Sequence, residues 1–173
     1  MTAVELYPGR ISDLGVGIIP LEEIVRQSGL ELLQRLLAGD YPAPAIAAVL
    51  NFALVEVSEG VAVFEGVPGE RHLNPLGGVH GGWAASILDS ALGCAVHATL
   101  ASGEAYTTAE FKVNLTRPIT PRTGLVRCEG KVIHRGRTLA VSEARLTDSA
   151  GKLLAFGTET CSIFAVESLT GRR

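Results

Sequence analysis

The feature that most constrains this chain is a long apolar stretch, residues 81–103, in which Asp89 is the one charged side chain. Most residues in it favour helix, and no proline follows until Pro118. A helix that is apolar nearly all round has no face suited to water, so other elements must surround it. We therefore expect one long helix, from about Gly82 to Leu100, covered by the rest of the chain.

Strand-like segments on both sides of this helix can supply the cover. Two segments rich in β-branched residues, 53–57 and 61–67, precede it and are joined by Ser58-Glu59-Gly60, which is typical of a hairpin. Four segments follow it, several with alternating apolar and polar residues, at 106–116, 124–134, 138–147 and 153–164. The order predicts an α+β fold in which a curved antiparallel sheet wraps around one long central helix.

The N-terminal region predicts a helical extension. Apolar residues recur at helical spacing from Leu21 to Ala38, and Ser28-Gly29 is a candidate break. Glycine and two prolines in GDYPAPAI end this helix. We divide the chain into an arm and amphipathic helix at 1–45, with residues 1–20 as a loose arm, a main domain at 46–166, and a disordered tail at 167–173.

Composition narrows the class of protein. With 173 residues and 47% hydrophobic content the chain is sized for one domain. The formal charge is −3 and the basic residues form no continuous run, so we expect no nucleic-acid partner. The three cysteines are widely spaced, which argues against a disulfide framework or a zinc site and fits a reducing cytoplasm. Glu5 stands where a signal peptide needs basic residues.

A membrane span is the rival interpretation of residues 81–103. An aspartate near the middle of a span costs roughly 2.5–3.5 kcal/mol on insertion scales. Glycines are frequent in the stretch, and no Lys or Arg flanks it closely. We therefore expect no membrane partner.

The start of the long helix is suited to an oxygen that gains negative charge. Gly81-Gly82 after His80 allow another molecule to approach the backbone closely. The first N–H groups of a helix have no partner within it, and the positive end of the helix dipole lies behind them.

The combination of Asn74, Gly77, His80-Gly81-Gly82 and Asp89 resembles the PaaI-like (phenylacetate-pathway) family of hotdog-fold acyl-CoA thioesterases. Two later segments, TTAEFKVNLTRPI and VIHRGRTLAVSEARLTDSAGKLLAFGT, are similar to strands of that family. The resemblance covers about residues 45–165. It implies a hotdog fold, a homodimer or homotetramer, and hydrolysis of an acyl-CoA to the free acid and CoA, with no cofactor beyond the substrate and no metal.

The chemistry of the residues assigns roles within this resemblance. The Gly81 N–H would polarise the thioester carbonyl, and Asp89 would act as nucleophile or as general base toward water. His80 either caps the helix or contacts substrate, and Asn74 either orients the loop or donates to the thioester. Thr108, which the resemblance places opposite the acid, would hold the attacking water, although adjacent Thr107 is an alternative.

Helix geometry separates the two main catalytic groups. Eight residues of helix rise about 12 Å, whereas reacting atoms must approach to about 3–3.5 Å. Gly81 and Asp89 of one chain therefore cannot easily act on one carbonyl. We predict that Gly81 of one subunit acts with Asp89 of another.

Other residues are candidates for binding. Gly82 belongs to the substrate-binding loop, and Arg135, Gly136 and Arg137 either bind the CoA phosphates or form a solvated turn. We expect Cys94 and His97 to be packing residues rather than a catalytic pair or metal ligands. Trp83 and Tyr41 are either core residues or part of an acyl pocket.

The acyl group is expected to be aryl or medium-chain aliphatic. Two alternative functions remain: a non-catalytic acyl-CoA sensor, and a hotdog-fold hydratase or dehydratase of acyl thioesters. The carboxylate in the apolar helix and the double glycine favour hydrolysis.

Overall fold

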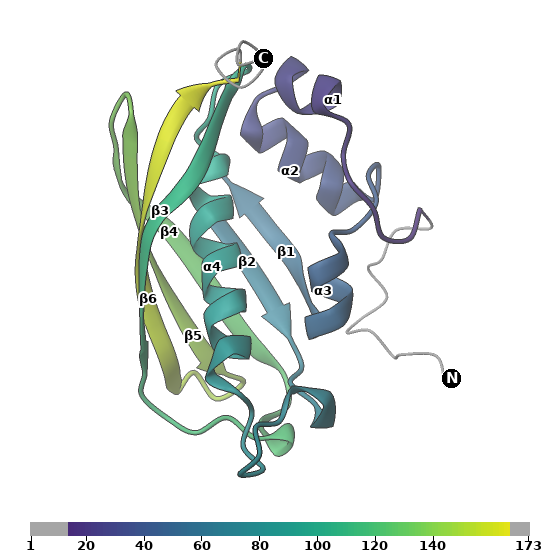
Figure 1. Ribbon diagram of the computed structural model, residues 1–173, viewed down its shortest axis with the longest axis vertical. Helices are drawn as coiled ribbons and strands as arrows, with labels where there is room; N and C mark the ends of the chain where they lie inside the picture. The colour runs from purple at the N-terminus through teal and green to yellow at the C-terminus, as the bar shows by residue number, and fades with distance from the viewer. Residues whose placement is uncertain (1–13, 167–173) are drawn as a thin grey trace.

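A six-stranded antiparallel sheet curves around one long helix in the computed structural model, which describes residues 14–166 (Figure 1). The strand order is β1-β2-β4-β5-β6-β3. Along the chain the elements are α1 (Leu21–Arg26), α2 (Gly29–Ala38), α3 (Ala45–Leu50), β1 (Phe52–Ser58), β2 (Val61–Gly66), α4 (Gly81–His97), β3 (Glu104–Leu115), β4 (Val126–Arg135), β5 (Leu139–Asp148) and β6 (Leu153–Ala165), with short 3-10 turns at Glu70–His72 and Pro121–Thr123.

The central helix α4 packs closely on the concave face of the sheet. Its residues Ile87, Leu88, Leu92 and Val96 are fully buried, as its apolar composition requires. Gly130 of β4 makes the close approach possible: a Cβ there would lie 2.2 Å from the carbonyl oxygen of Ala91, which no larger residue could tolerate. The prediction of a sheet wrapped around one apolar helix is confirmed, and this arrangement is the hotdog fold.

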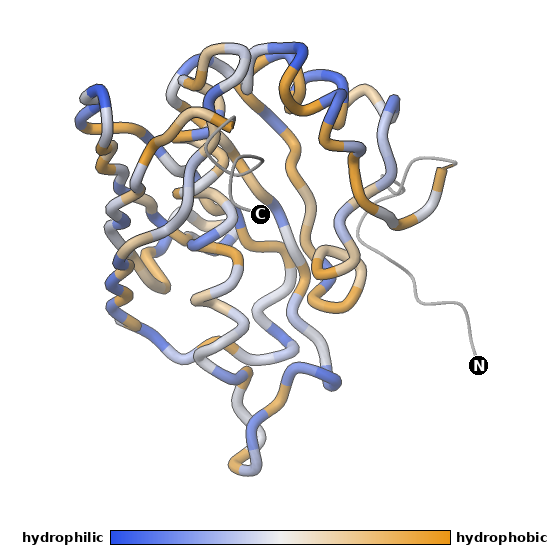
Figure 2. Tube along the Cα trace, turned by 45° about the horizontal axis from the view of Figure 1, so that its top comes forward, coloured by the Kyte–Doolittle hydropathy of each residue, from blue (hydrophilic) through white to orange (hydrophobic). Residues whose placement is uncertain are grey.

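The N-terminal helices form a separate layer beside β1 (Figure 1). The break expected at Ser28-Gly29 is confirmed, because Ser28 starts α2 with a capping box to Glu31. Gly39 ends α2 in the left-handed conformation, at φ 90°. Figure 2 shows mixed hydrophilic and hydrophobic residues along these helices, as expected for a layer with one wet face.

Gly29 fixes this layer to the central helix. Its N–H donates to the Leu100 carbonyl oxygen at 3.0 Å, and a Cβ at this position would lie 1.8 Å from the His97 carbonyl oxygen. The backbone of α2 therefore meets the end of α4 with no room for a side chain.

One expectation for the N-terminal region needs correction. Residues 15–17 are not a loose arm, because the Gly17 N–H donates to Ala43 and the Ala43 N–H donates to Gly15. A further short helix, α3, begins at Ala45, directly after Pro44. Residues 1–13 and the expected tail at 167–173 lie outside the described residues.

The two edges of the sheet differ. Edge strand β1 packs against α2 and α3, whereas the other edge strand, β3, is exposed from Thr107 to Glu110. A register shift between Thr108 and Glu110 leaves Ala109 as an extra residue in β3. Within residues 14–166 no helix combines the length and apolar character that a membrane span requires.

Candidate active site

The beginning of α4 is organised by His80. This residue is the N-cap, and its ring Nδ1 accepts a hydrogen bond of 2.9 Å from the Gly82 N–H. The structure therefore shows His80 as a helix cap. Its ring occupies the Gly82 N–H. The Gly81 N–H has no hydrogen-bond partner among residues 14–166. It points out of the helix at the positive end of the helix dipole.

Asn74 shapes the loop that precedes α4. Its Oδ1 accepts from the N–H groups of Leu76 at 2.9 Å and Gly78 at 3.3 Å. Two backbone donors on that oxygen fix the amide orientation, so the Nδ2 group is left as a donor. Asn74 and Gly81 line one open hollow of about 350 Å³, the loop hollow, with Leu115 and Ile119 among its other walls.

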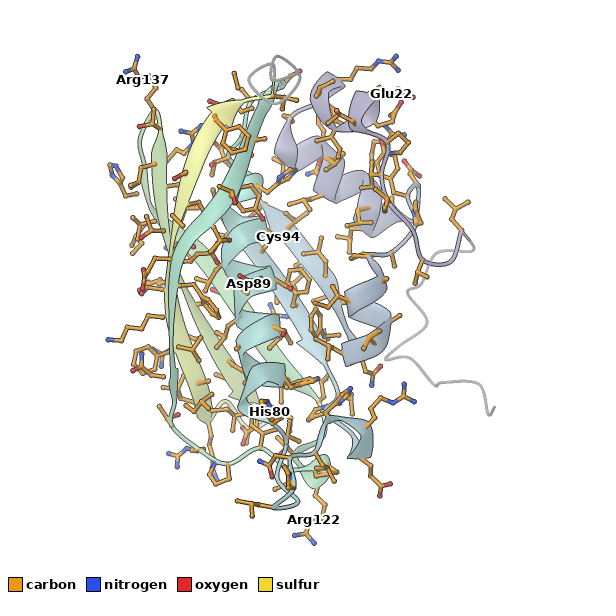
Figure 3. The ribbon with its side chains drawn as sticks, viewed as in Figure 1. Glu22, His80, Asp89, Cys94, Arg122 and Arg137 are labelled. Carbon is orange, nitrogen blue, oxygen red and sulfur yellow. The ribbon has the colours of Figure 1, made fainter. Side chains whose placement is uncertain are left out.

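Asp89 and Thr108 lie elsewhere, at an apolar cavity of about 270 Å³. Figure 3 shows Asp89 midway along α4, well removed from His80 at its start. The cavity is walled mainly by apolar side chains of the N-terminal layer and the first hairpin, among them Leu36, Leu37, Tyr41, Pro44, Ile46, Ala47, Phe52, Leu54 and Phe64. Ser90, Cys94 and Tyr106 complete the side formed by α4 and β3.

The environment of Asp89 makes its carboxylate a stronger base. Loss of hydration against the cavity wall raises its pKa above the ordinary aspartate value. In the single chain Asp89 is nevertheless exposed. The sheet covers most of α4, but the face bearing Asp89 points toward the cavity and the free strand β3.

One chain does not bring all the predicted residues together. Asp89 and Thr108 share the apolar cavity, while Asn74 and Gly81 share the loop hollow. This separation agrees with the distance expected from helix geometry. Gly81 is the first residue of α4, and Asp89 lies at its middle.

A second carboxyl group, which the sequence reasoning missed, lies behind Thr108. Glu159 of β6 is fully buried, and its Oε1 accepts from Thr108 Oγ1 at 2.7 Å and from Cys161 Sγ at 3.0 Å. Burial raises the pKa of Glu159, and the nearby Asp89 charge adds to the effect. The sequence did hold a signal: Glu159 falls on the inward positions of β6, between Gly157 and Cys161.

The basic residues expected to bind CoA lie at the turn between β4 and β5. Arg137 is exposed and stands at the far end of the sheet from His80 (Figure 3). Arg135 is ion-paired with Glu104 at 2.7 Å, which offsets part of its charge.

The remaining candidates separate into packing and lining residues. His97 is largely buried, and burial lowers its pKa to about 4. Cys94 lines the cavity, and burial raises its pKa to about 12, which leaves it a poor nucleophile. Trp83 is a core residue whose Nε1 donates to the Leu50 carbonyl, whereas Tyr41 lines the cavity. Within residues 14–166 no three His, Cys, Asp or Glu side chains are placed to hold a metal.

Comparisons with known proteins show the family of the chain. Residues 76–155 match the thioesterase superfamily. A candidate esterase of Saccharolobus solfataricus is 33% identical over 112 residues, which are 64% of this chain and 77% of that protein.

Solved structures give the same result. A candidate thioesterase of Ralstonia eutropha JMP134, related to phenylacetic acid degradation, superposes with a TM-score of 0.68 and 32% identity over 75% of this chain and 97% of its own. The E. coli PaaI protein from the phenylacetic acid degradation operon has a TM-score of 0.64 and 22% identity over 70% and 85% of the two chains, a likeness of fold. The chain belongs to the thioesterase superfamily, and the PaaI-like resemblance is confirmed.

Proposed function

We propose that this protein is an acyl-CoA thioesterase that hydrolyses aryl- or medium-chain acyl-CoA. The observation that carries the proposal is the placement of Asp89 and Thr108 at the polar side of an otherwise apolar cavity. A carboxylate with a raised pKa, beside a hydroxyl and an apolar acyl site, suits attack on a thioester.

The complete site would join two copies of the chain. Asp89 and Thr108 of one subunit would face Gly81 and Asn74 of the partner subunit. The free edge of β3, which lies beside Asp89, is the surface we propose for this pairing, because an exposed strand edge can bind a second copy of itself. Two such sites would form in each symmetric dimer.

The proposed reaction uses four groups, of which Thr108 holds the attacking water. Water attacks the carbonyl carbon while Asp89 takes its proton, and the partner subunit's Gly81 N–H stabilises the negative carbonyl oxygen, with Asn74 of the partner subunit as second donor. The C–S bond then breaks, and the CoA thiolate leaves and receives the proton from Asp89. The products are a carboxylic acid and CoA. If Asp89 is instead the nucleophile, CoA leaves first and water then cleaves an acyl anhydride.

The cavity supports the proposed substrate class. An apolar cavity of ~150 Å³ can hold a benzene molecule. At about 270 Å³, this cavity has room for an aromatic ring with its linker or for a medium aliphatic chain. For CoA itself we propose contacts with Arg135, Gly136 and Arg137 of one subunit and close approach at Gly82 of the partner subunit, since these groups lie at opposite ends of one chain.

Thiol release tests the proposal. The parent protein is incubated with aryl- and fatty-acyl-CoAs beside Asp89→Asn, and Glu129→Gln makes the same chemical change on the exposed face of β4. We expect Asp89→Asn to lower kcat by about 10²–10⁴-fold, with Glu129→Gln unchanged. Undiminished thiol release by Asp89→Asn contradicts the proposal. If the parent protein binds acyl-CoA without releasing thiol, a sensor is favoured. If it converts acyl-CoA without releasing thiol, a hydratase is favoured.

A rapid-quench experiment separates the two roles of Asp89. A stoichiometric burst of thiol ahead of free acid indicates an acyl-enzyme and a nucleophilic Asp89. Simultaneous appearance of thiol and acid indicates a general base.

A further inference from the structure

Glu159 is a buried carboxyl group for which the hydrolysis as proposed has no use. Its side chain has no exposed surface, and it reaches from β6 to Thr108 Oγ1 on β3 across 2.7 Å. Burying a carboxyl group is costly unless its hydrogen bonds compensate. A residue that only filled space at this inward position would be apolar, like Ile163 further along the same face.

The surroundings indicate a neutral carboxyl group. Both recorded donors, Thr108 and Cys161, use Oε1, while Oε2 has no partner among residues 14–166. Ser142 lies directly opposite Glu159 in β5, and its buried Oγ also lacks a partner within the same residues. A proton on Oε2 removes the unpaired buried charge and leaves Oε1 as the acceptor for Thr108. Burial also raises the pKa of Glu159, which favours the protonated, neutral form.

The hydrogen bond from Thr108 fixes what this hydroxyl can do toward the cavity. A threonine hydroxyl has one proton to donate and two lone pairs. With the carboxyl proton of Glu159 on Oε2, Thr108 donates its own proton to Oε1, so the Thr108 oxygen can only accept from a molecule in the cavity. Water between Asp89 and Thr108 would give one hydrogen to each, which leaves an oxygen lone pair free to face the thioester.

We propose that Glu159 is a positioning residue that holds Thr108 as a hydrogen-bond acceptor and thereby orients the water that Asp89 activates. This inference rests on the proposed thioesterase function. Glu159 acts through Thr108 and does not itself touch the substrate.

The first test is the split between kcat and KM. Glu159→Met removes the acceptor at similar size, and we expect kcat to fall about 10- to 100-fold with KM within about twofold, since misoriented reactants lose rate. Glu159→Gln keeps a neutral acceptor for Thr108, so it retains most of the parental kcat. Glu159→Asp, a polar variant that folds more readily, withdraws the acceptor by one methylene and loses kcat as Glu159→Met does.

The second test is a double-mutant cycle with Thr108→Val. In that background Glu159→Met or Glu159→Asp should lower kcat no further, because the positioned hydroxyl is already gone. Cys161→Ala is the matched control: it removes the other donor to the same oxygen and should leave kcat unchanged. Thermal unfolding of every variant accounts for lost folded protein.

The outcomes separate this inference from the function beneath it. If Glu159→Met and Glu159→Asp leave the Asp89-dependent thiol release intact, the positioning role is overturned and the thioesterase function stands. Additive losses with Thr108→Val, or an equal loss in Cys161→Ala, overturn it as well. A parent protein without thiol release overturns the thioesterase proposal and this one together.

Discussion

At the scale of single residues, the strongest effects come from titratable groups placed among apolar neighbours. His97 ends α4 beneath α2, and its ring packs edge-on against Tyr106. Burial there opposes the charged imidazolium, so the folded protein holds a neutral ring at pH values where a free histidine is largely protonated.

We expect His97 to make stability depend on pH. Between pH 6.5 and about 4 the unfolded chain binds a proton that the folded chain does not, so the free energy of unfolding falls as pH falls. The change in pKa corresponds to roughly 3 kcal/mol at most. Urea unfolding across this range should show a shallower loss for His97→Gln than for the parent. Exposed His134→Gln should follow the parent, and equal slopes in all three proteins would contradict the prediction.

The residues that sequence could identify are those whose chemistry is local. Gly81 and Asp89 are linked by helix spacing, and Asn74 and His80 by position before the helix start. Glu159 was missed because its partner Thr108 lies 51 residues away, and only the folded sheet makes them neighbours. The exposure of Asp89 could not be predicted either. It depends on the position of β3 as the edge strand of the folded sheet.

At the scale of elements, the N-terminal layer acts as one wall of the apolar cavity. Leu36 and Leu37 of α2 line it, and α2 is held in place by the contact of Gly29 with the end of α4. This layer therefore links the stability of the extension to the shape of the apolar cavity.

Gly29→Ala should disturb that wall. The added methyl group meets the His97 carbonyl, so we expect about 1–3 kcal/mol of destabilisation and a raised KM for acyl-CoA as α2 shifts. Gly69→Ala is the control, because φ is −138° and no atom lies within 4 Å of its added Cβ. Urea unfolding and steady-state kinetics measure both effects. Parental stability and KM in Gly29→Ala would show that the contact does not hold α2.

Elements were predictable where burial follows a regular period. Several strands after α4 were located in this way, whereas α4 was located by its long apolar stretch without proline and the first two strands by their β-branched residues. The capping residues of α2 marked its ends. Helix α3 was not identified, because AIAAVL contains no polar residue and so has no period. The cavity wall that α2 and α3 form could not be predicted from the sequence, because it depends on contacts between segments far apart in the chain.

At the scale of the whole molecule, the separation of Gly81 from Asp89 predicts that inactive subunits rescue each other. Gly81→Pro removes the N–H at the first helical position, where proline is tolerated, and His80 at φ −61° and ψ 135° is compatible with a following proline. Alone, Gly81→Pro and Asp89→Asn should both be inactive.

Mixing the two variants tests whether the site is shared. After denaturation and refolding together, about half of the dimers are mixed and each has one intact site, so about a quarter of parental activity should return. Mixing either variant with the doubly substituted chain should restore nothing. Failure of the two single variants to recover activity, with dimers verified by sedimentation, would place each site within one chain.

The two unlike edges of the sheet also limit how far self-association can proceed. Helices α2 and α3 lie against β1, which leaves β3 as the edge open to pairing among the described residues. In the proposed dimer each copy has used its open edge at β3, and β1 offers a third copy no free strand edge. We therefore expect the N-terminal layer that shapes the cavity to prevent growth into a filament as well.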